Sequence, residues 1–142
     1  MIHNIRYRLF VYKDEDEEKL LQNLKNILPT AKPKREIAKG IFKDEIVIFS
    51  GKIEKKNETE KFIKNFSSIN KEDLYKLSSD FERKVDKNGN LFLRFSKYSV
   101  CEDTLEICDS GDSIHLQIKI STYPAKKKVA INLLNEFLKD YL

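Results

Sequence analysis

The chain has little of what marks secreted, membrane-spanning or metal-binding proteins. Its two cysteines, Cys101 and Cys108, have a spacing that matches no zinc or redox motif, so we expect reduced thiols and a cytoplasmic protein. No apolar run approaches the roughly 20 residues needed to cross a bilayer. Residues 1–10 also lack the apolar core and cleavage site of a signal peptide. We therefore expect neither secretion by that route nor a membrane partner.

Motifs for catalysis are also scarce. The four glycines form neither a phosphate-binding loop nor a dinucleotide-binding fingerprint. With only His3 and His115 as imidazoles, a mixed Cys/His metal site would have to combine distant positions. The acidic run 14–18 fits a solvated helix start better than a Mg²⁺ site, and His115 fits a surface residue better than a general acid or base. We predict no enzyme, no cofactor and no metal.

What the chain does contain is enough apolar material for one core. Its 142 residues fall in the size range of a single domain, which we place at 1–142, and 40% of them are hydrophobic. Lysine and arginine number 27 against 23 aspartates and glutamates, which gives a net charge of +4. This modest excess permits nucleic-acid binding if the cations share one face.

The hydrophobic patterns predict an α+β fold. Apolar residues alternate in strands and recur three or four residues apart in helices, Asn57 and Asn70 can cap helices, and Asn88-Gly89 is a turn signal. Clustered strands joined by short turns favour an antiparallel or mixed sheet with helices mainly on one face. The expected order is strand 5–12, helix 14–28, strands 36–42 and 45–54, helices 57–66 and 70–85, strands 91–96, 104–108 and 114–120, and helix 122–141.

The strand positions opposite the predicted core carry basic and aromatic side chains. Basic groups contact phosphates and rings stack on bases, so an open sheet face of this kind can hold RNA. The alternative is a covered or merely solvated face, on which the rings pack against other elements. The side chains concerned are Arg6, Arg8, Phe10, Tyr12, Phe92, Arg94, His115 and Lys119.

Two further basic zones extend this pattern, one from Lys32 to Lys39 and one at Lys126-Lys127-Lys128. A helix that begins near the second zone would add unpaired backbone amides that attract phosphate. Each zone taken alone also fits an ordinary soluble surface. The residues that we predict to bind RNA are Arg6, Arg8, Phe10, Phe92, Arg94, Lys97, Lys119, Lys126 and Lys127.

Three segments also resemble a known family. They are the acidic stretch 11–19, the turn and strand 86–97, and the strand 114–119 that leads to Tyr123-Pro124-Ala125-Lys126. The chain is similar over most of its length to small archaeal proteins grouped as RNA-binding and sometimes described as exosome-associated. That resemblance implies RNA binding and a fold like double-stranded-RNA-binding domains or the 5S-rRNA-binding ribosomal protein. Segment 40–46 has a single glycine where such proteins are glycine-richer, so we expect no close phosphate approach there.

These observations support two functional hypotheses. The first is a non-enzymatic RNA-binding protein that contacts backbone and shape and acts in RNA processing or ribosome-related assembly. The second is a protein interaction subunit that dimerises, or docks on a larger RNA-processing assembly, through the same sheet face or an exposed strand edge. An enzyme assembled from scattered residues comes third. The sequence does not fix the strand order, so the placing of Arg6, Arg94 and Lys119 on one face is a prediction.

Overall fold

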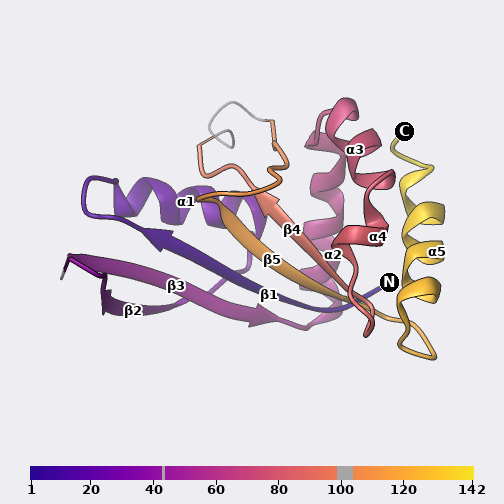
Figure 1. Cartoon of the computed structure of the whole chain (residues 1–142), viewed down its shortest axis with the longest axis horizontal. Helices are drawn as coiled ribbons and strands as arrows, with labels where there is room; N and C mark the ends of the chain where they lie inside the picture. Colours follow the sequence, from indigo (N-terminus) through magenta and orange to yellow (C-terminus); the bar gives the residue numbers. More distant parts are fainter. Residues whose placement is uncertain (43, 99–103) are drawn as a thin grey trace.

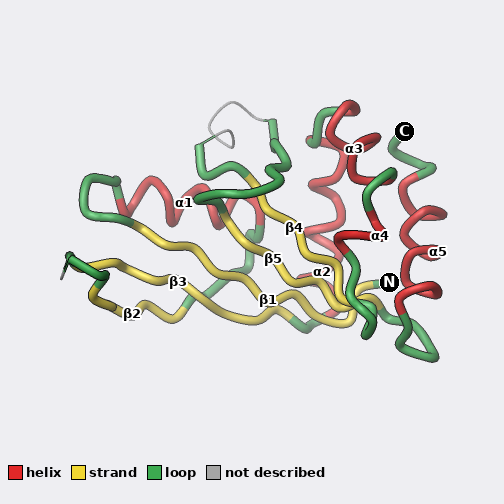
Figure 2. Tube along the Cα trace, in the orientation of Figure 1, coloured by secondary structure: helices red, strands yellow, loops and turns green. Residues whose placement is uncertain are grey.

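A computed structural model describes residues 1–42, 44–98 and 104–142, and its centre is an antiparallel sheet (Figures 1 and 2). The five strands lie in the order β2-β3-β1-β5-β4, so the first strand of the chain is central. Every neighbouring pair is antiparallel. The strands are β1 (Ile2–Val11), β2 (Lys34–Lys39), β3 (Glu45–Ile53), β4 (Asn90–Phe95) and β5 (Ile114–Ile120).

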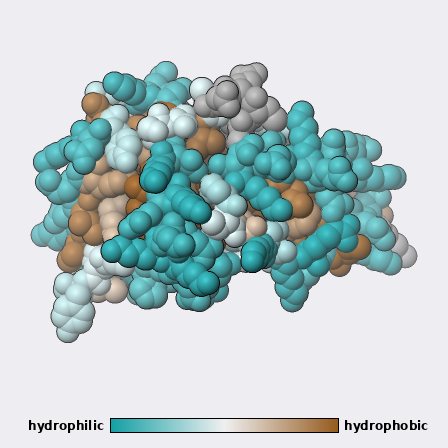
Figure 3. Space-filling model, turned by 180° about the vertical axis from the view of Figure 1, so that it is seen from behind, coloured by the Kyte–Doolittle hydropathy of each residue, from teal (hydrophilic) through white to brown (hydrophobic). Residues whose placement is uncertain are grey.

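The helices lie on one side of this sheet and at one end of it. Figure 1 shows α1 and α2 behind the strands, with α3, α4 and α5 gathered at the end near the N-terminus. Seen from behind, the surface over the helices is mostly hydrophilic (Figure 3). No helix in the described ranges is both long and apolar enough to cross a membrane. The helices are α1 (Glu17–Ile27), α2 (Lys56–Lys64), the 3-10 turn η1 (Asn65–Ser68), α3 (Lys71–Ser78), α4 (Phe81–Lys84) and α5 (Lys127–Leu138).

Helix α1 shows how local signals and core packing agree. The Asp16 side chain caps it by accepting a hydrogen bond from the Lys19 amide, at 3.2 Å, and acidic residues fill the first turn. Its apolar side chains Leu20, Leu24 and Ile27 are fully buried, as are Ile5 and Leu9 of β1. Each such side chain contributes about 1.5–3 kcal/mol when removed from water. The predicted acidic helix start is therefore confirmed.

Some predicted boundaries differ from the structure. Asn70 caps α3 as predicted and accepts from the Asp73 amide at 2.9 Å, but Asn57 caps nothing, because α2 already begins at Lys56. The last helix begins at Lys127 rather than at 122–124. Residue preference alone places caps to within a few positions, since the packing of the helix selects among neighbouring candidates.

The segment predicted as a strand at 104–108 is held to its surroundings by isolated bridges. Leu105 pairs with Ile69, and Ile107 pairs with Phe95 at the end of β4. Cys108 has a half-buried free thiol, whose pKa is raised first by burial and then by nearby carboxylates. The companion Cys101 lies outside the described residues.

The turn before β4 is built by one aspartate and one glycine. Asp86 accepts hydrogen bonds from the amides of Asn88 and Asn90, both at 2.9 Å, and these bonds lower the pKa of its carboxyl even though burial raises it. Gly89 adopts φ 80°, a conformation that glycine reaches without steric cost. The Asn-Gly turn signal is thus confirmed, and it sets the phase of β4 that leaves Phe92 on the solvent side.

Candidate nucleic-acid interface

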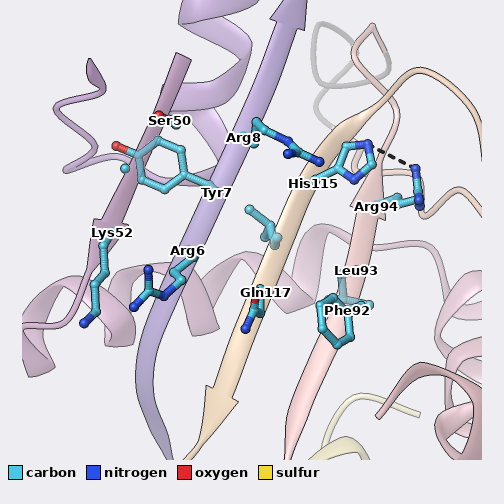
Figure 4. A pocket seen from close by; sticks show the side chains of 12 residues that line it. Arg6, Tyr7, Arg8, Ser50, Lys52, Phe92, Leu93, Arg94, His115 and Gln117 are labelled. Carbon is cyan, nitrogen blue, oxygen red and sulfur yellow. Dashed lines mark hydrogen bonds between the residues drawn. The ribbon is translucent and has the colours of Figure 1, made fainter. Parts of the chain in front are cut away.

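The face of the sheet away from α1 and α2, here called the open face, carries two rows of polar and aromatic side chains (Figure 4). In the first row Arg8 pairs with Ser50 of β3 and with His115 of β5. His115 in turn pairs with Arg94 of β4. Directly opposed residues of an antiparallel pair point to the same side with Cβ atoms about 5 Å apart, so the row is continuous.

The second row lies one step along the strands. Arg6 pairs with Lys52 on one side and with Gln117 on the other, and Gln117 pairs with Phe92. The two rows line a groove of about 560 Å³, here called the open-face groove. The structure therefore brings Arg6, Arg8, Phe92 and Arg94 to one face, as predicted.

The groove is strongly cationic. No carboxylate of the described residues forms an ion pair with Arg6, Arg8 or Arg94. Lys52 adds a fourth cation, whose Nζ lies 3.4 Å from Oε2 of the exposed Glu54. The guanidinium carbon of Arg8 lies 5.0 Å from the centre of the Phe10 ring. This cation–π contact holds the guanidinium in place without neutralising its charge. Phe10 is half-buried and supports Arg8 rather than standing free.

His115 is held as a neutral ring within this row. Its Nε2 lies 3.0 Å from Arg94 Nη1, and because a guanidinium can only donate, Nε2 is the accepting nitrogen. The same Nη1 donates to the carbonyl of Gly111 at 3.2 Å. Burial and then the charges of Arg94 and Arg8 lower the pKa of His115, so the imidazole is uncharged at pH 7 and leaves its other nitrogen as a donor.

The exposed ring of the groove is Phe92. It retains 46% of its accessible surface although it belongs to a sheet whose opposite face is buried. It lies on β4, at the edge of the sheet, so a flat partner can approach it from above. An exposed ring beside cations is the arrangement that stacks on a nucleobase.

The prediction that Lys97 contacts phosphate is wrong, and the residue is structural. It is 2% exposed, and its Nζ donates to Glu15 Oε1 at 2.6 Å, Asp112 Oδ2 at 2.8 Å and the Phe10 carbonyl at 2.7 Å. The Tyr12 ring lies 5.1 Å from the ammonium. Two carboxylates and a carbonyl therefore consume the donors that a phosphate would need.

The remaining predicted lysines lie around the groove rather than in it. Lys119 is on the open face, but its ammonium donates to the Asn88 carbonyl in the turn before β4. Lys126 and Lys127 are at the start of α5, outside the two rows, and Lys127 pairs with Glu82 at 3.1 Å. Of the three, Lys126 is exposed and has no ion pair within the described residues.

Sequence reasoning missed Ser50, Lys52 and Gln117. All three belong to predicted strands, and the alternation in 114–120 already put Gln117 on the polar side of its strand. Only the pairing of β3 and β5 with β1 puts them next to Arg6 and Arg8. Alternation within a strand can indicate the side on which a residue lies, but it cannot indicate which strand lies next to it.

A comparison with protein families identifies the group to which the molecule belongs. The model of a family described by RNA binding matches residues 4–120, which includes β1 from its third residue, the other four strands and the open-face groove. The chain belongs to this RNA-binding family.

Individual relatives agree with this assignment. The RNA-binding protein PAB1135 of Pyrococcus abyssi is 29% identical, and the match covers 96% of this chain and 94% of that protein. The structure of Mth689, a DUF54 protein from Methanothermobacter thermautotrophicus, is 39% identical with a TM-score of 0.85, and the match covers 97% of this chain and 98% of Mth689. SSO0741 from Sulfolobus solfataricus, at 21% identity and a TM-score of 0.76 over 97% and 96% of the two chains, shares the fold.

Proposed function

We propose that this family member binds RNA on the open face, with Arg6, Arg8 and Arg94 on phosphates and Phe92 on an unpaired base. The observation that carries the proposal is the open-face groove itself, which three arginines without a carboxylate partner among the described residues line together with an exposed ring. Maintaining such a field without counter-charge is unfavourable unless an anion is bound. RNA supplies both the anion and the flat group that the ring accepts.

The neutral members of the two rows would add hydrogen bonds rather than charge. His115 offers a ring N–H beside Arg8, and Gln117 offers an amide with both donors and an acceptor beside Phe92. These groups suit a ribose hydroxyl and a base edge, and the 2′-hydroxyl is what distinguishes RNA from DNA. Lys119, Lys126 and Lys127 extend the proposed interface as outer phosphate contacts, and Phe10 holds Arg8 in place.

A salt titration of binding tests this proposal. Affinity for generic single-stranded RNA should fall steeply with salt, by a slope of roughly 0.7 per phosphate contact, and should exceed affinity for double-stranded DNA of the same length. Arg8→Glu should weaken binding and flatten the slope. Arg83→Glu, the same change on α4, is the matched control. Equal and weak binding of the two nucleic acids, lost near physiological salt, would contradict the proposal.

The hairpin tip favours a second candidate function, protein interaction. Ile41 is 96% exposed and Phe42 is 88% exposed, and β2 is an edge strand with an unpaired side. Exposed edges and apolar tips are contacts through which chains dimerise or dock on assemblies. Docking on an RNA-processing assembly, or a role in ribosome-related assembly, would use this end. Sedimentation of the wild type and of Ile41→Ser/Phe42→Ser tests it, since a monomer in both would argue against self-association.

A further inference from the structure

A second cavity lies on the other side of the sheet, where α1 ends and α2 begins. Its volume is about 650 Å³, and it is here called the α2 cavity. The turn after α1 forms one wall, the start of α2 forms another, and the end of β3 forms the floor. Four lysines line it, Lys25, Lys32, Lys52 and Lys55, against a single carboxylate, Glu58.

Two hydroxyl groups in this cavity have no hydrogen-bond partner within the described residues. The Tyr7 side chain is only 4% exposed, lines the cavity and lies across Gly51, where even a methyl group would collide with the phenol oxygen. Thr30 Oγ1 is fully buried and is also unpaired. A fully buried polar group without a partner is destabilising by about 1–3 kcal/mol, which applies to Thr30 Oγ1. The Tyr7 hydroxyl is an unpaired donor at the wall of the cavity, where a ligand can reach it.

Helix α2 points its positive end at the same space. It is a helix of nine residues whose N-cap, Lys55, contributes no side-chain cap, and Lys55, Asn57 and Glu58 line the cavity. The first amides of a helix have no intrahelical acceptor, so those of Lys56 and Asn57 remain free to donate. Uncapped amides together with the helix dipole form an anion site when other donors converge on them.

We propose that the α2 cavity is a phosphate-binding site distinct from the open-face groove. The amides of α2, the Tyr7 hydroxyl and the four lysines are all donors, and a phosphate group accepts from many donors at once. The one opposing group, Glu58, is near enough to Tyr7 that its charge, after burial, contributes to the raised pKa of the phenol. Glu58 therefore limits affinity and provides a sensitive test.

The position of the cavity indicates how RNA could supply this phosphate. Strand β2 pairs with β3 only as far as Ser50, so beyond that residue β3 is the local edge of the sheet. Lys52 lies there and lines both the open-face groove and the α2 cavity. A strand held on the open face, as proposed above, can therefore pass this edge and place a phosphate at α2. The phosphate could be internal or terminal.

Titration of inorganic phosphate into the ¹⁵N-labelled full-length protein tests the site without any RNA. The amide signals of Lys56 and Asn57 should shift and saturate. Tyr7→Phe, which removes one hydroxyl that has no protein partner, should weaken binding by about fivefold without lowering Tm. Lys55→Glu should abolish binding, and Glu58→Gln should strengthen it severalfold.

Controls separate this site from the open face. Tyr12→Phe removes a hydroxyl from outside the cavity and should leave phosphate binding unchanged, as should Arg8→Glu. Absence of amide shifts at high phosphate concentration, or identical affinities in wild type, Tyr7→Phe and Lys55→Glu, would overturn the proposal whether or not the open face binds RNA.

Oligonucleotides with and without a 5′-phosphate identify the source of the phosphate. If it is terminal, phosphorylation tightens binding and Tyr7→Phe removes that gain. If it is internal, Tyr7→Phe weakens both oligonucleotides equally. A Tyr7→Phe variant that binds both as the wild type does would show that RNA does not use the cavity.

Discussion

Two cationic regions, the open-face groove and the surroundings of Lys97, look alike in sequence and differ in the folded molecule. Arg94 and Lys97 are three residues apart, yet Arg94 lies on the open face without an ion pair among the described residues, and Lys97 is buried against Glu15 and Asp112. The charge of Arg94 is not compensated by any described carboxylate, whereas the charge of Lys97 is neutralised inside the protein. The comparison shows that the location of the carboxylates separates an uncompensated surface cation from a structural one.

The energetic roles of the two regions should therefore be opposite. A buried ammonium stabilises through partners that cannot be replaced by water, whereas an exposed guanidinium contributes little to folding and much to anion affinity. Each variant below should change either stability or RNA binding and leave the other nearly unaltered.

The largest effect is expected at Lys97. Lys97→Met leaves the carboxylates of Glu15 and Asp112 and the Phe10 carbonyl without their shared donor, and should lower the free energy of unfolding by about 3 kcal/mol. Urea unfolding measures this. Lys139→Met, which breaks an exposed pair with Glu136 at 2.9 Å, should change stability by less than about 0.5 kcal/mol. Comparable effects of the two substitutions would contradict a structural role for Lys97.

The complementary effect should appear at the arginines. The double charge reversal Arg6→Glu/Arg8→Glu should reduce RNA affinity by roughly 100-fold at low salt, because two phosphate contacts become repulsive. Stability should stay within about 0.5 kcal/mol of the wild type, since neither residue has an ion pair to lose among the described carboxylates. Fluorescence anisotropy and urea unfolding provide the two readouts. Unchanged affinity would mean that RNA binds elsewhere.

A smaller effect should follow removal of the exposed ring. Phe92→Ala should weaken the binding of single-stranded RNA by roughly 1–3 kcal/mol, the contribution of one stacked base. It should weaken the binding of double-stranded RNA less, because the bases of a duplex are already stacked on one another. Phe92→Tyr keeps the ring and should retain most of the affinity. Equal losses for single and double strands would argue against stacking.

The smallest effect concerns pH and His115. The free protein lowers the pKa of this imidazole below its usual value, whereas a phosphate beside it would raise it, so binding should take up a proton. RNA affinity should therefore rise a few-fold between pH 7.5 and 5.5. The same shift means that His115 reduces folding stability as the pH falls through about 6.5. His115→Gln should abolish the dependence of RNA affinity on pH. If the affinity of that variant still depended on pH, a group other than His115 would take up the proton on binding.

The carboxylate partner of Lys97 titrates in a lower range. Burial raises the pKa of Glu15, but hydrogen bonds from Lys97, from Tyr98 and from the Tyr12 amide together lower it below its usual value. Its contribution to stability is complete above the unfolded pKa near 4.5 and is lost as the pH falls through the folded value. The two regions thus respond to acid in separate windows.

The sequence by itself determined which residues could face a ligand. Three of the features used are local: the alternating apolar residues of the first strand, the carboxylate cap before α1 and the Asn-Gly turn before β4. They are local because backbone period, capping and turn geometry depend on residues only a few positions apart. They were enough to predict an α+β fold and to place Arg6, Arg8, Phe92 and Arg94 on the solvent side of their strands.

Only the tertiary structure decided which of those residues lie side by side. The order β2-β3-β1-β5-β4 joins Lys52, Arg6, Gln117 and Phe92 into one row, and no local pattern encodes it. The burial of Lys97 depends on Glu15, 82 residues earlier in the chain. Strand pairing and ion pairing are long-range contacts selected by the packing of the whole core, so charge and periodicity read along the chain cannot specify them.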